Sequence, residues 1–382
     1  MTSIADYFHS FRAKIKIADA NRLIVTCNRD NRGSFSTLST GAFFMLKKSL
    51  LLFTALVSLS LGSSVSLAAG GFSFALVGDQ EYDAAQEALF PNLRNDIDRD
   101  TSIRFVVHDG DIKSGSSPCT DEIYQTRYND FNAFAKPFIY VPGDNEWTDC
   151  HRTKAGGYDP LERLNKLRSV FFKYEDKMTL GTQKMALKRQ SVEFPENVTW
   201  ASGGVTFVGL NVPGSNNGLS ATTNNTYDAA MKADYDKRNA ANLAFLKSAF
   251  DSAKKTNKLG LMVIIQANPW DYIPTTELTG YQDFLTLLES ETRAFGKPVV
   301  LVHGDSHYFR IDKPLPNAFD PAAEFQKFAW ESTEPRLENF TRVETFGTVN
   351  VHWLKVTVDP ADPSLFTFRQ RIVEKNKATV TQ

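Results

Sequence analysis

The chain lacks an excess of basic residues. It carries 43 lysines and arginines against 44 aspartates and glutamates, which gives a formal charge of −1 at pH 7. Eight of the basic residues but only three of the acidic ones precede residue 69, so the formal charge of residues 69–382 is −6. A protein that binds nucleic acid through its phosphates needs a basic face. The composition therefore argues against a nucleic-acid binder and is more easily reconciled with a small-molecule substrate.

The chain also lacks an apolar run long enough to span a membrane comfortably. Its main apolar stretch, Ser49 to Leu61, follows Met45-Leu46-Lys47-Lys48 and leads into Ser66-Leu67-Ala68. A charged start, a short apolar centre and a small-residue exit are typical of a secretory signal peptide. We predict a signal peptide over residues 45–68 that is cleaved after Ala68, with no membrane contact afterwards. A membrane anchor over Leu50 to Leu67 that stays in place is the alternative.

Forty-four residues precede Met45, and they are polar, without a clear pattern and mildly basic. Because a signal peptide starts at the initiating methionine, we interpret residues 1–44 as an upstream extension from a misassigned start codon, without regular structure. A disordered tail on a membrane-anchored protein is the alternative. Residues 69–382 contain no internal repeat and no linker rich in proline or serine, so they are predicted to form a single domain.

Cysteine is scarce, with three residues in the chain. Cleavage after Ala68 removes Cys27 and leaves Cys119 and Cys150, an even number that suits an oxidising compartment. We predict that these two form a disulfide, which would stabilise the fold by roughly 3 kcal/mol in the chain-entropy model. Two free buried thiols are the alternative. The predicted location is the periplasm or the outside of the cell, and the sequence does not indicate an oligomeric state.

Five short polar segments each follow an apolar run that looks like a strand. Side chains just past the carboxyl ends of parallel strands converge at one edge of an α/β sheet, where ligands bind. Hard oxygen ligands gathered there suit one or two divalent cations. The alternative is that Asp and Gly only form turns at these strand ends. The segments are Gly78-Asp79-Gln80-Glu81, Gly110-Asp111-Ile112-Lys113, Gly143-Asp144-Asn145-Glu146, Gln266-Ala267-Asn268-Pro269 and Gly304-Asp305-Ser306-His307.

The apolar pattern alternates between strand and helix periodicity, which predicts an α/β fold. Residues 213–226 are rich in Gly, Ser, Asn and Thr and are predicted to form a long loop near the site. The predicted helices cover residues 84–98, 121–134, 161–172, 227–255 and 281–295. Beyond the five runs before the polar segments, strands are predicted at residues 191–194, 205–212, 325–330, 349–358 and 365–373.

The five segments, in this order and spacing, resemble the calcineurin-like metallophosphoesterase family over nearly all of residues 69–382. The family pattern is Asp-x-His, Gly-Asp-x-x, Gly-Asn-His-Asp/Glu, a histidine at a strand end, and Gly-His-x-His. The resemblance implies a four-layered α/β/β/α sandwich, with two mixed central sheets flanked by helices. It also implies a dinuclear metal centre at which a metal-activated water attacks a phosphate mono- or diester.

The departures from the family pattern change the expected ligands. Asp79 and Asp111 match the first and the bridging aspartate, and His307 is the one ligand histidine that remains. The replacements are Glu81 for a histidine, Asp144 for the asparagine, Gln266 for the strand-end histidine and Asp305 for the first histidine of the last motif. Oxygen ligands favour Mg²⁺, Mn²⁺ or Ca²⁺ over Zn²⁺ or Fe.

The resemblance divides these ligands between two ions. Asp79, Glu81, Asp111 and His307 would hold the first ion, and Asp111, Asp144, Gln266 and Asp305 the second. Asn145 stands where the family has its catalytic histidine and would bind a phosphoryl oxygen, but an amide cannot act as a general acid at neutral pH. The candidates for a substitute are His303, His151 and His108, each of which also fits an ordinary structural role.

Three side chains are candidate substrate contacts. Trp147 and Trp270 follow the polar segments closely and would form aromatic walls for a ring-bearing leaving group, with Tyr272 and Tyr308 adding to them. Lys113 would place a positive charge near the phosphate. Packing, and for Lys113 exposure to solvent, are the structural alternatives.

The hypothesis that follows is a metal-dependent phosphoesterase acting on a small phosphorylated substrate. One alternative is a protein that keeps the fold and binds divalent metal or a phosphorylated ligand without turnover. A carboxylate-based glycosidase is a third, which needs two opposed carboxylates in a sugar cleft.

Overall fold

The computed structural model describes residues 13–19, 22–27, 70–219, 228–270, 279–316 and 335–377. The chain divides into two units, residues 1–66 and 67–382. In the first unit, strands β1 (Ala13–Asp19) and β2 (Arg22–Cys27) form an antiparallel hairpin. The sequence analysis predicted no regular structure there. Short alternation of lysine and isoleucine in β1 and the β-branched run in β2 favour strands. The predicted signal peptide lies outside the described residues.

Five strands of the second unit form a mixed sheet in the order β14-β13-β3-β4-β5. Strands β3 (Phe72–Val77), β4 (Ile103–His108) and β5 (Phe138–Tyr140) are parallel. Strand β13 (Trp353–Val358) pairs antiparallel with β3, and β14 (Phe366–Arg371) pairs antiparallel with β13. The polar segments containing Asp79, Asp111 and Asp144 follow the three parallel strands, so they leave this sheet at one edge.

Seven strands form the second mixed sheet in the order β11-β12-β10-β9-β8-β7-β6. Its centre is the parallel set β8 (Val205–Gly209), β9 (Gly260–Ile264), β10 (Val299–His303) and β12 (Phe340–Glu344). Strands β6 (Lys188–Arg189), β7 (Val198–Ser202) and β11 (Arg310–Asp312) are antiparallel to their neighbours. Gln266 follows β9 and Asp305 follows β10, so both lie at the carboxyl edge of this sheet.

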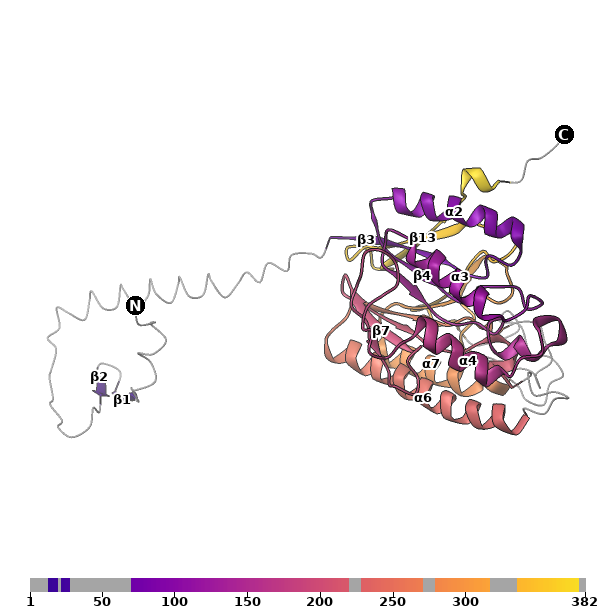
Figure 1. Ribbon diagram of the computed structural model, residues 1–382. Helices are drawn as coiled ribbons and strands as arrows, with labels where there is room; N and C mark the ends of the chain where they lie inside the picture. The colour runs from indigo at the N-terminus through magenta and orange to yellow at the C-terminus, as the bar shows by residue number, and fades with distance from the viewer. Residues whose placement is uncertain are drawn as a thin grey trace, which may run out of the picture. The chain divides into compact units, whose positions relative to one another are not determined.

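The two sheets pack face to face, and helices cover their outer faces (Figure 1). Phe74 and Leu76 of β3 face the second sheet, whereas the alternate residues Ala75 and Val77 face helices. This period of two buries both faces of a central strand. The helices on the first sheet are α2 (Ala84–Arg99), α3 (Asp121–Asn132) and α4 (Pro160–Phe171), and those on the second are α6 (Asp228–Lys255) and α7 (Gln282–Phe295).

The predicted four-layered α/β/β/α sandwich of two mixed sheets is therefore confirmed. Helix starts agree with the sequence because capping side chains fix them. Asp83 accepts from the Gln86 amide at 2.9 Å, and Asp159 accepts from the Leu161 amide at 2.8 Å.

The strand predicted at residues 191–194 is wrong, and the strand that pairs with the second sheet in this region is β6. The one predicted at residues 325–330 lies outside the described residues. No helix in the described ranges has the length and apolar character that crossing a membrane requires.

Candidate metal centre

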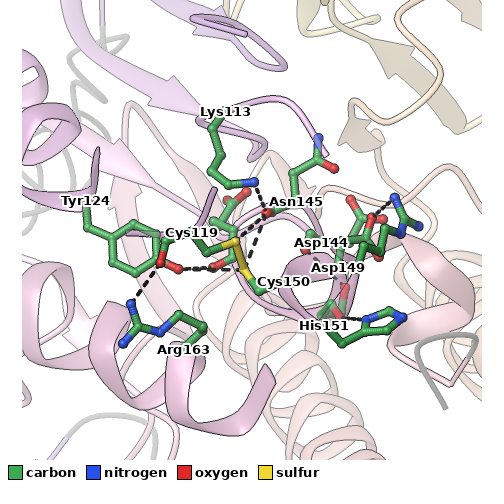
Figure 2. Close-up of a disulfide and its surroundings, with 12 residues drawn as sticks. Lys113, Cys119, Tyr124, Asp144, Asn145, Asp149, Cys150, His151 and Arg163 are labelled. Carbon is green, nitrogen blue, oxygen red and sulfur yellow. Dashed lines mark hydrogen bonds and ion pairs between the residues drawn. A yellow bond between two sulfur atoms is a disulfide. The ribbon is translucent and has the colours of Figure 1, made fainter. Parts of the chain in front are cut away.

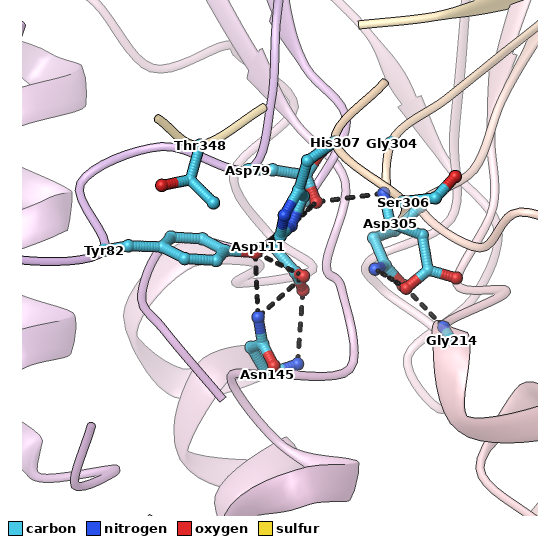
Figure 3. A network of polar contacts seen from close by, with 12 residues as sticks. Asp79, Tyr82, Asp111, Asn145, Gly214, Gly304, Asp305, Ser306, His307 and Thr348 are labelled. Atoms are coloured by element: carbon cyan, nitrogen blue, oxygen red, sulfur yellow. Dashed lines mark hydrogen bonds and ion pairs between the residues drawn. The ribbon is translucent and has the colours of Figure 1, made fainter. Parts of the chain in front are cut away.

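The carboxyl ends of the two sheets bring four aspartates together. Asp79, Asp111 and Asp144 follow strands of the first sheet, and Asp305 follows a strand of the second. The Asp305 amide donates to Asp79 Oδ1 at 3.0 Å, which ties the two edges (Figure 3). Glycine is required beside these carboxylates, because a Cβ on Gly304 would lie 1.9 Å from Asp79 Oδ2 and a Cβ on Gly143 2.1 Å from Asp111 Oδ1. The glycine of each Gly-Asp pair thus permits close approach of a neighbouring loop.

Two groups of side chains in this cluster have the composition of metal sites. Asp79, Asp111 and His307 form the first, and Asp111, Asp144 and Asp305 the second. Within each group, one ligand atom per residue lies within 4.8 Å of the others. Asp111 belongs to both groups. The predicted ligands other than Glu81 and Gln266 therefore fall into two sets that share the residue expected to bridge.

Four of these residues adopt a left-handed backbone. The φ angles are 49° at Asp79, 57° at Asp111, 80° at Asp305 and 57° at His307. A side chain other than glycine pays a conformational cost of about 1–3 kcal/mol there, and such residues gather at functional sites because the surroundings hold them. The strain turns the four side chains out of the strand direction and toward one another (Figure 3).

Tyr82 lies inside the cluster, and the sequence analysis did not single it out. Its hydroxyl donates to Asp111 Oδ2 at 2.8 Å, lies 3.0 Å from His307 Nε2 and accepts from Asn145 Nδ2 at 2.9 Å. Its ring meets the His307 imidazole edge to face (Figure 3). The signal in the sequence was its position three residues after Asp79, on the loop between β3 and α2.

Gln266 lies beside the second group, with its amide nitrogen toward the carboxylates. Nε2 donates to Asp144 Oδ1 and to Asp305 Oδ1, each at 3.1 Å, while Oε1 accepts from the Gly214 amide at 2.5 Å. In this orientation the Gln266 amide nitrogen positions the carboxylates of Asp144 and Asp305, while the amide oxygen is already hydrogen-bonded to the backbone of Gly214. Its predicted role as a ligand would require the amide to rotate.

Glu81 points away from both groups. Its buried carboxylate pairs with Arg127 at 3.3 Å, and Arg127 also donates to the Glu81 carbonyl at 2.8 Å. Burial, opposed by Arg127, raises the pKa of Glu81 to about 8. The structure therefore does not bring Glu81 to the other predicted ligands, and it gives this residue a structural partner instead.

The loop that carries Asp144 and Asn145 is fixed from beneath. Glu146 Oε1 accepts from the Gly143 amide at 2.6 Å and from the Tyr140 hydroxyl at 2.7 Å. Lys113 is fully buried, and its ammonium donates to the Asn145 carbonyl at 2.6 Å (Figure 2). Burial lowers the pKa of Lys113. The prediction that Lys113 contacts substrate is therefore wrong, and so is the alternative of a solvated side chain.

The predicted disulfide is confirmed. Cys119 and Cys150 are bonded, with their Cα atoms 5.8 Å apart. The bond joins the loop after Asp111 to the 3-10 helix η2 (Thr148–His151), which follows Asn145 (Figure 2). It therefore links two walls of the cluster.

The three histidines considered as proton donors do not reach the cluster. His303 is fully buried on β10, its Nδ1 lies 2.8 Å from the Gly304 carbonyl, and burial lowers its pKa well below the usual value. His151 Nδ1 lies 2.7 Å from the Thr148 carbonyl (Figure 2). His108 is buried and accepts from the Gly110 amide at 3.2 Å. None of them lines the pocket described below.

The predicted aromatic walls are not found in the described residues. Trp147 is fully buried beneath Arg238, whose guanidinium carbon lies 5.0 Å from the ring centroid, so substrate cannot reach it. Trp270 packs against Arg342 and Phe340. Tyr308 is 68% exposed and does not line the pocket. Tyr272 lies outside the described residues.

A pocket of about 580 Å³ opens onto the cluster. Its lining includes four of the candidate ligands together with Tyr82 and Asn145. The remaining lining residues supply hydroxyls and two cations, of which Arg152 pairs with Asp149 at 2.6 Å and Lys154 is exposed. They are Ser114, Gly115, Ser116, Asp149, Arg152, Thr153 and Lys154.

The electrostatics of the cluster fit a bound cation. Burial and neighbouring carboxylates, foremost Asp144, raise the pKa of Asp111 well above its usual range. Within the described ranges no lysine or arginine pairs with Asp79, Asp111 or Asp144, and Asp79 Oδ2 is buried without a hydrogen-bond partner. Buried carboxyls of this kind stay ionised at neutral pH only when a counter-charge such as a metal ion lies beside them, and otherwise take up a proton. Oxygen-rich ligands with one imidazole suit a hard divalent metal.

Comparisons with known proteins show likeness in fold only. No protein-family model and no curated protein matches the chain by sequence. GAP50, the anchor in the inner membrane complex of Plasmodium, is similar at 11% identity and a TM-score of 0.46, over 82% of this chain and 88% of that one. Purple acid phosphatase PPD1 from yellow lupin (Lupinus luteus) seeds has the same identity and score, over 81% of this chain and 52% of the lupin chain.

A third solved structure, TT1561 of Thermus thermophilus, is similar at 7% identity and a TM-score of 0.40, over 79% of this chain and 99% of that one. The chain thus spans about half the length of the lupin protein. At these identities no residue role passes from any of the three to this chain.

Proposed function

We propose that this protein is a metal-dependent phosphoesterase, a divergent relative of the calcineurin-like metallophosphoesterases. The observation that carries the proposal is the pair of ligand groups that share Asp111 at the floor of a pocket. The order of the five polar segments in the sequence and the four-layered sandwich support it. A small phosphorylated substrate suits this pocket, because its volume is about 580 Å³ and its lining combines the candidate ligands with hydroxyls and cations.

Asp79, Asp111 and His307 would hold one ion and Asp111, Asp144 and Asp305 the other. Two divalent ions would polarise the phosphoryl oxygens and lower the pKa of a water. Mg²⁺, Mn²⁺ or Ca²⁺ fits this donor set better than Zn²⁺ or Fe, since a single imidazole accompanies four carboxylates. Gln266 contributes by holding Asp144 and Asp305 in place.

The residues of this chain prepare the pocket for an anionic substrate. Lys154 and Arg152 line the same pocket as the ligands, where their positive charges would attract phosphate, although Asp149 already neutralises part of the Arg152 charge. Asn145 directs Nδ2 to Asp111 Oδ2 at 2.7 Å and to Tyr82. Because its two amide hydrogens are both directed to these groups, a phosphoryl oxygen that binds Asn145 would replace one of these contacts. Its first role in the proposal is to orient Asp111.

A location in the periplasm or outside the cell is part of the proposal. The disulfide between Cys119 and Cys150 supports it, because such bonds persist in oxidising compartments. The signal peptide predicted over residues 45–68 agrees with this location.

A second function, binding of divalent metal or a phosphorylated ligand without turnover, is favoured by one observation. The position of a general acid holds Asn145, and neither His303 nor His151 lines the pocket. A leaving group of high pKa would then depart without help, and hydrolysis would be slow.

The test is hydrolysis of p-nitrophenyl phosphate and its bis ester by the full chain, with Mg²⁺, Mn²⁺, Ca²⁺ or a chelator. Asp111→Asn is the inactivating variant, and Asp251→Asn, which changes an exposed side chain of helix α6, is the matched control. We expect metal-dependent turnover that Asp111→Asn removes and Asp251→Asn keeps. Metal binding without turnover on either ester would favour the binding protein, and turnover that survives the chelator or Asp111→Asn would refute both readings.

A further inference from the structure

A short left-handed turn lies beside the second ligand group. Residues Gly214–Asn217 form α5, and the φ angles are 52° at Ser215, 53° at Asn216 and 58° at Asn217. Consecutive left-handed residues other than glycine are unusual, because the Cβ of each lies too close to the following carbonyl oxygen. The structure must therefore hold this turn from outside.

Hydrogen bonds from buried polar groups hold the turn in this conformation. Arg238 of α6 is fully buried, and its guanidinium donates to Asn217 Oδ1 at 2.5 Å and to the Asn217 carbonyl at 2.8 Å. The Gly280 amide donates to Asn216 Oδ1 at 2.7 Å, and the Tyr281 hydroxyl donates to the Pro213 carbonyl at 3.1 Å. These contacts come from two separate segments of the chain, so the turn is fixed over its whole length.

The turn delivers one hydroxyl to the cluster. Ser215 Oγ lies 2.9 Å from Asp144 Oδ2 and 2.8 Å from Asp149 Oδ1. The same turn acts on the other oxygen of Asp144, because the Gly214 amide holds Gln266, and Gln266 Nε2 donates to Asp144 Oδ1. One strained turn thus orients both oxygens of Asp144.

Asp144 belongs to the second ligand group and not to the first. We infer that the Ser215 hydroxyl is a positioning group for the second ion, so that the left-handed turn sets the affinity of one site of the pair. Without the hydroxyl, Asp144 Oδ2 loses this partner while Gln266 still holds Oδ1, so the carboxylate is held less firmly beside Asp305. The inference rests on the metal centre of the proposed function.

The effect should be selective for one ion. Loss of a partner that orients a metal ligand typically costs 10- to 100-fold in metal affinity. We therefore expect Ser215→Ala to weaken the second Mn²⁺ by about this factor and to leave the first unchanged. A general loss of structure would weaken both sites together.

Ser215→Gly separates the hydroxyl from the backbone. Glycine adopts φ > 0 without steric cost, so this variant relieves the strain of the turn but also removes the hydroxyl. If the hydroxyl acts, both variants weaken the second ion to a similar degree. If the backbone conformation alone matters, Ser215→Gly binds as the wild type does. Ser169→Ala, on the exposed surface of α4, is the control for loss of a serine hydroxyl.

The experiment is a calorimetric titration of the metal-free full chain with Mn²⁺, with bound Mn²⁺ counted by electron paramagnetic resonance. Two ions in the wild type and selective weakening of one in both Ser215 variants support the inference. Two ions of unchanged affinity in Ser215→Ala, recovery in Ser215→Gly, or equal weakening of both sites overturns it and leaves the metal centre standing. No Mn²⁺ bound to the wild type overturns the metal centre itself, and the inference with it.

Discussion

At the scale of single residues, the candidate site depends on side-chain contacts and backbone conformations that only the surrounding folded structure holds in place. Asp111 contacts Tyr82 and Asn145 and belongs to both ligand groups. Four ligand residues have positive φ angles. The sequence indicates the aspartates, because Gly-Asp at a strand end is a local pattern. Tyr82 stands three residues after Asp79, but the approach of its hydroxyl to Asp111 depends on the conformation of the loop between β3 and α2, which no local pattern gives.

His108 connects the site to stability against acid. Burial lowers its pKa to about 3, and its Nδ1 accepts from the Gly110 amide in the turn before Asp111. In the unfolded chain the His108 imidazole binds a proton near pH 6.5, whereas in the folded chain it stays neutral down to about pH 3. The free energy of unfolding therefore falls as the pH drops from about 6.5 toward 3. The loss is about 1.4 kcal/mol per pH unit over that window.

His108→Asn keeps an acceptor for the Gly110 amide but does not titrate. We expect its free energy of unfolding to depend less steeply on pH between 6.5 and 4 than that of the wild type. Urea unfolding at several pH values measures this difference. Parallel curves for the two proteins would show that His108 does not contribute to acid lability.

A substitution of Lys154 tests whether the cations of the pocket lining attract the substrate. Lys154→Met removes a positive charge but no metal ligand, so we expect KM for p-nitrophenyl phosphate to rise roughly 3- to 10-fold with kcat nearly unchanged, the pattern of lost uniform binding. The increase should shrink at high salt. Lys177→Met, outside the pocket, is the matched control and should keep the wild-type KM. Equal kinetics for the two variants would remove Lys154 from substrate attraction.

At the scale of elements, the main helices follow from periodicity and capping, and the strands before the polar segments follow from apolar runs. Strand β12 was missed, although it occupies an interior place in the second sheet. Its five residues include Thr341 and Arg342, and the pairing with β10 that makes them a strand is set by the fold. Burial of Lys113 was missed for the same reason, because it lies in a loop that later elements cover, whereas for Trp147 the structure agrees with the packing alternative.

Arg127 of α3 pairs with Glu81, a residue that was predicted to be a metal ligand. Its guanidinium is buried between Glu81 and Glu87, and it also donates to the Ile112 carbonyl at 2.7 Å. Arg127→Met leaves Glu81 buried without its partner, and we expect a loss of about 3–5 kcal/mol in the free energy of unfolding.

Adding Glu81→Gln to Arg127→Met should recover part of this loss, which urea unfolding of the single and double variants measures. Glu81→Gln alone should bind as many Mn²⁺ ions as the wild type. Loss of one ion in Glu81→Gln would restore Glu81 as a ligand.

The disulfide links elements rather than neighbours. Cys119 and Cys150 are 31 residues apart in the sequence. The chain-entropy model gives a stabilisation of about 3–4 kcal/mol for a loop of this size. We expect the Cys119→Ser/Cys150→Ser protein to lose roughly this free energy in urea unfolding, and reduction of the wild type to have the same effect. An unchanged midpoint after reduction would contradict this expectation.

At the scale of the whole molecule, two sheets bring their carboxyl edges to one place, and this arrangement defines the site. Asp79 and Asp111 come from one sheet and Asp305 from the other, so the cluster exists only when the sandwich is complete. Metal that binds the folded chain alone must stabilise it by mass action. We expect Mn²⁺ to raise the unfolding temperature and a chelator to lower it. A thermal shift that Mn²⁺ does not change would argue against the cluster as a metal site.

The most direct test counts the metal ions bound by four proteins. Asp79→Asn, Asp144→Asn and Asp111→Asn are compared with the wild type by equilibrium dialysis against Mn²⁺, with circular dichroism to verify the fold. Because Asp111 belongs to both groups, we expect two ions in the wild type, one each in Asp79→Asn and Asp144→Asn, and none in Asp111→Asn. Two ions retained by a folded Asp111→Asn would contradict the shared centre on which the proposed function depends.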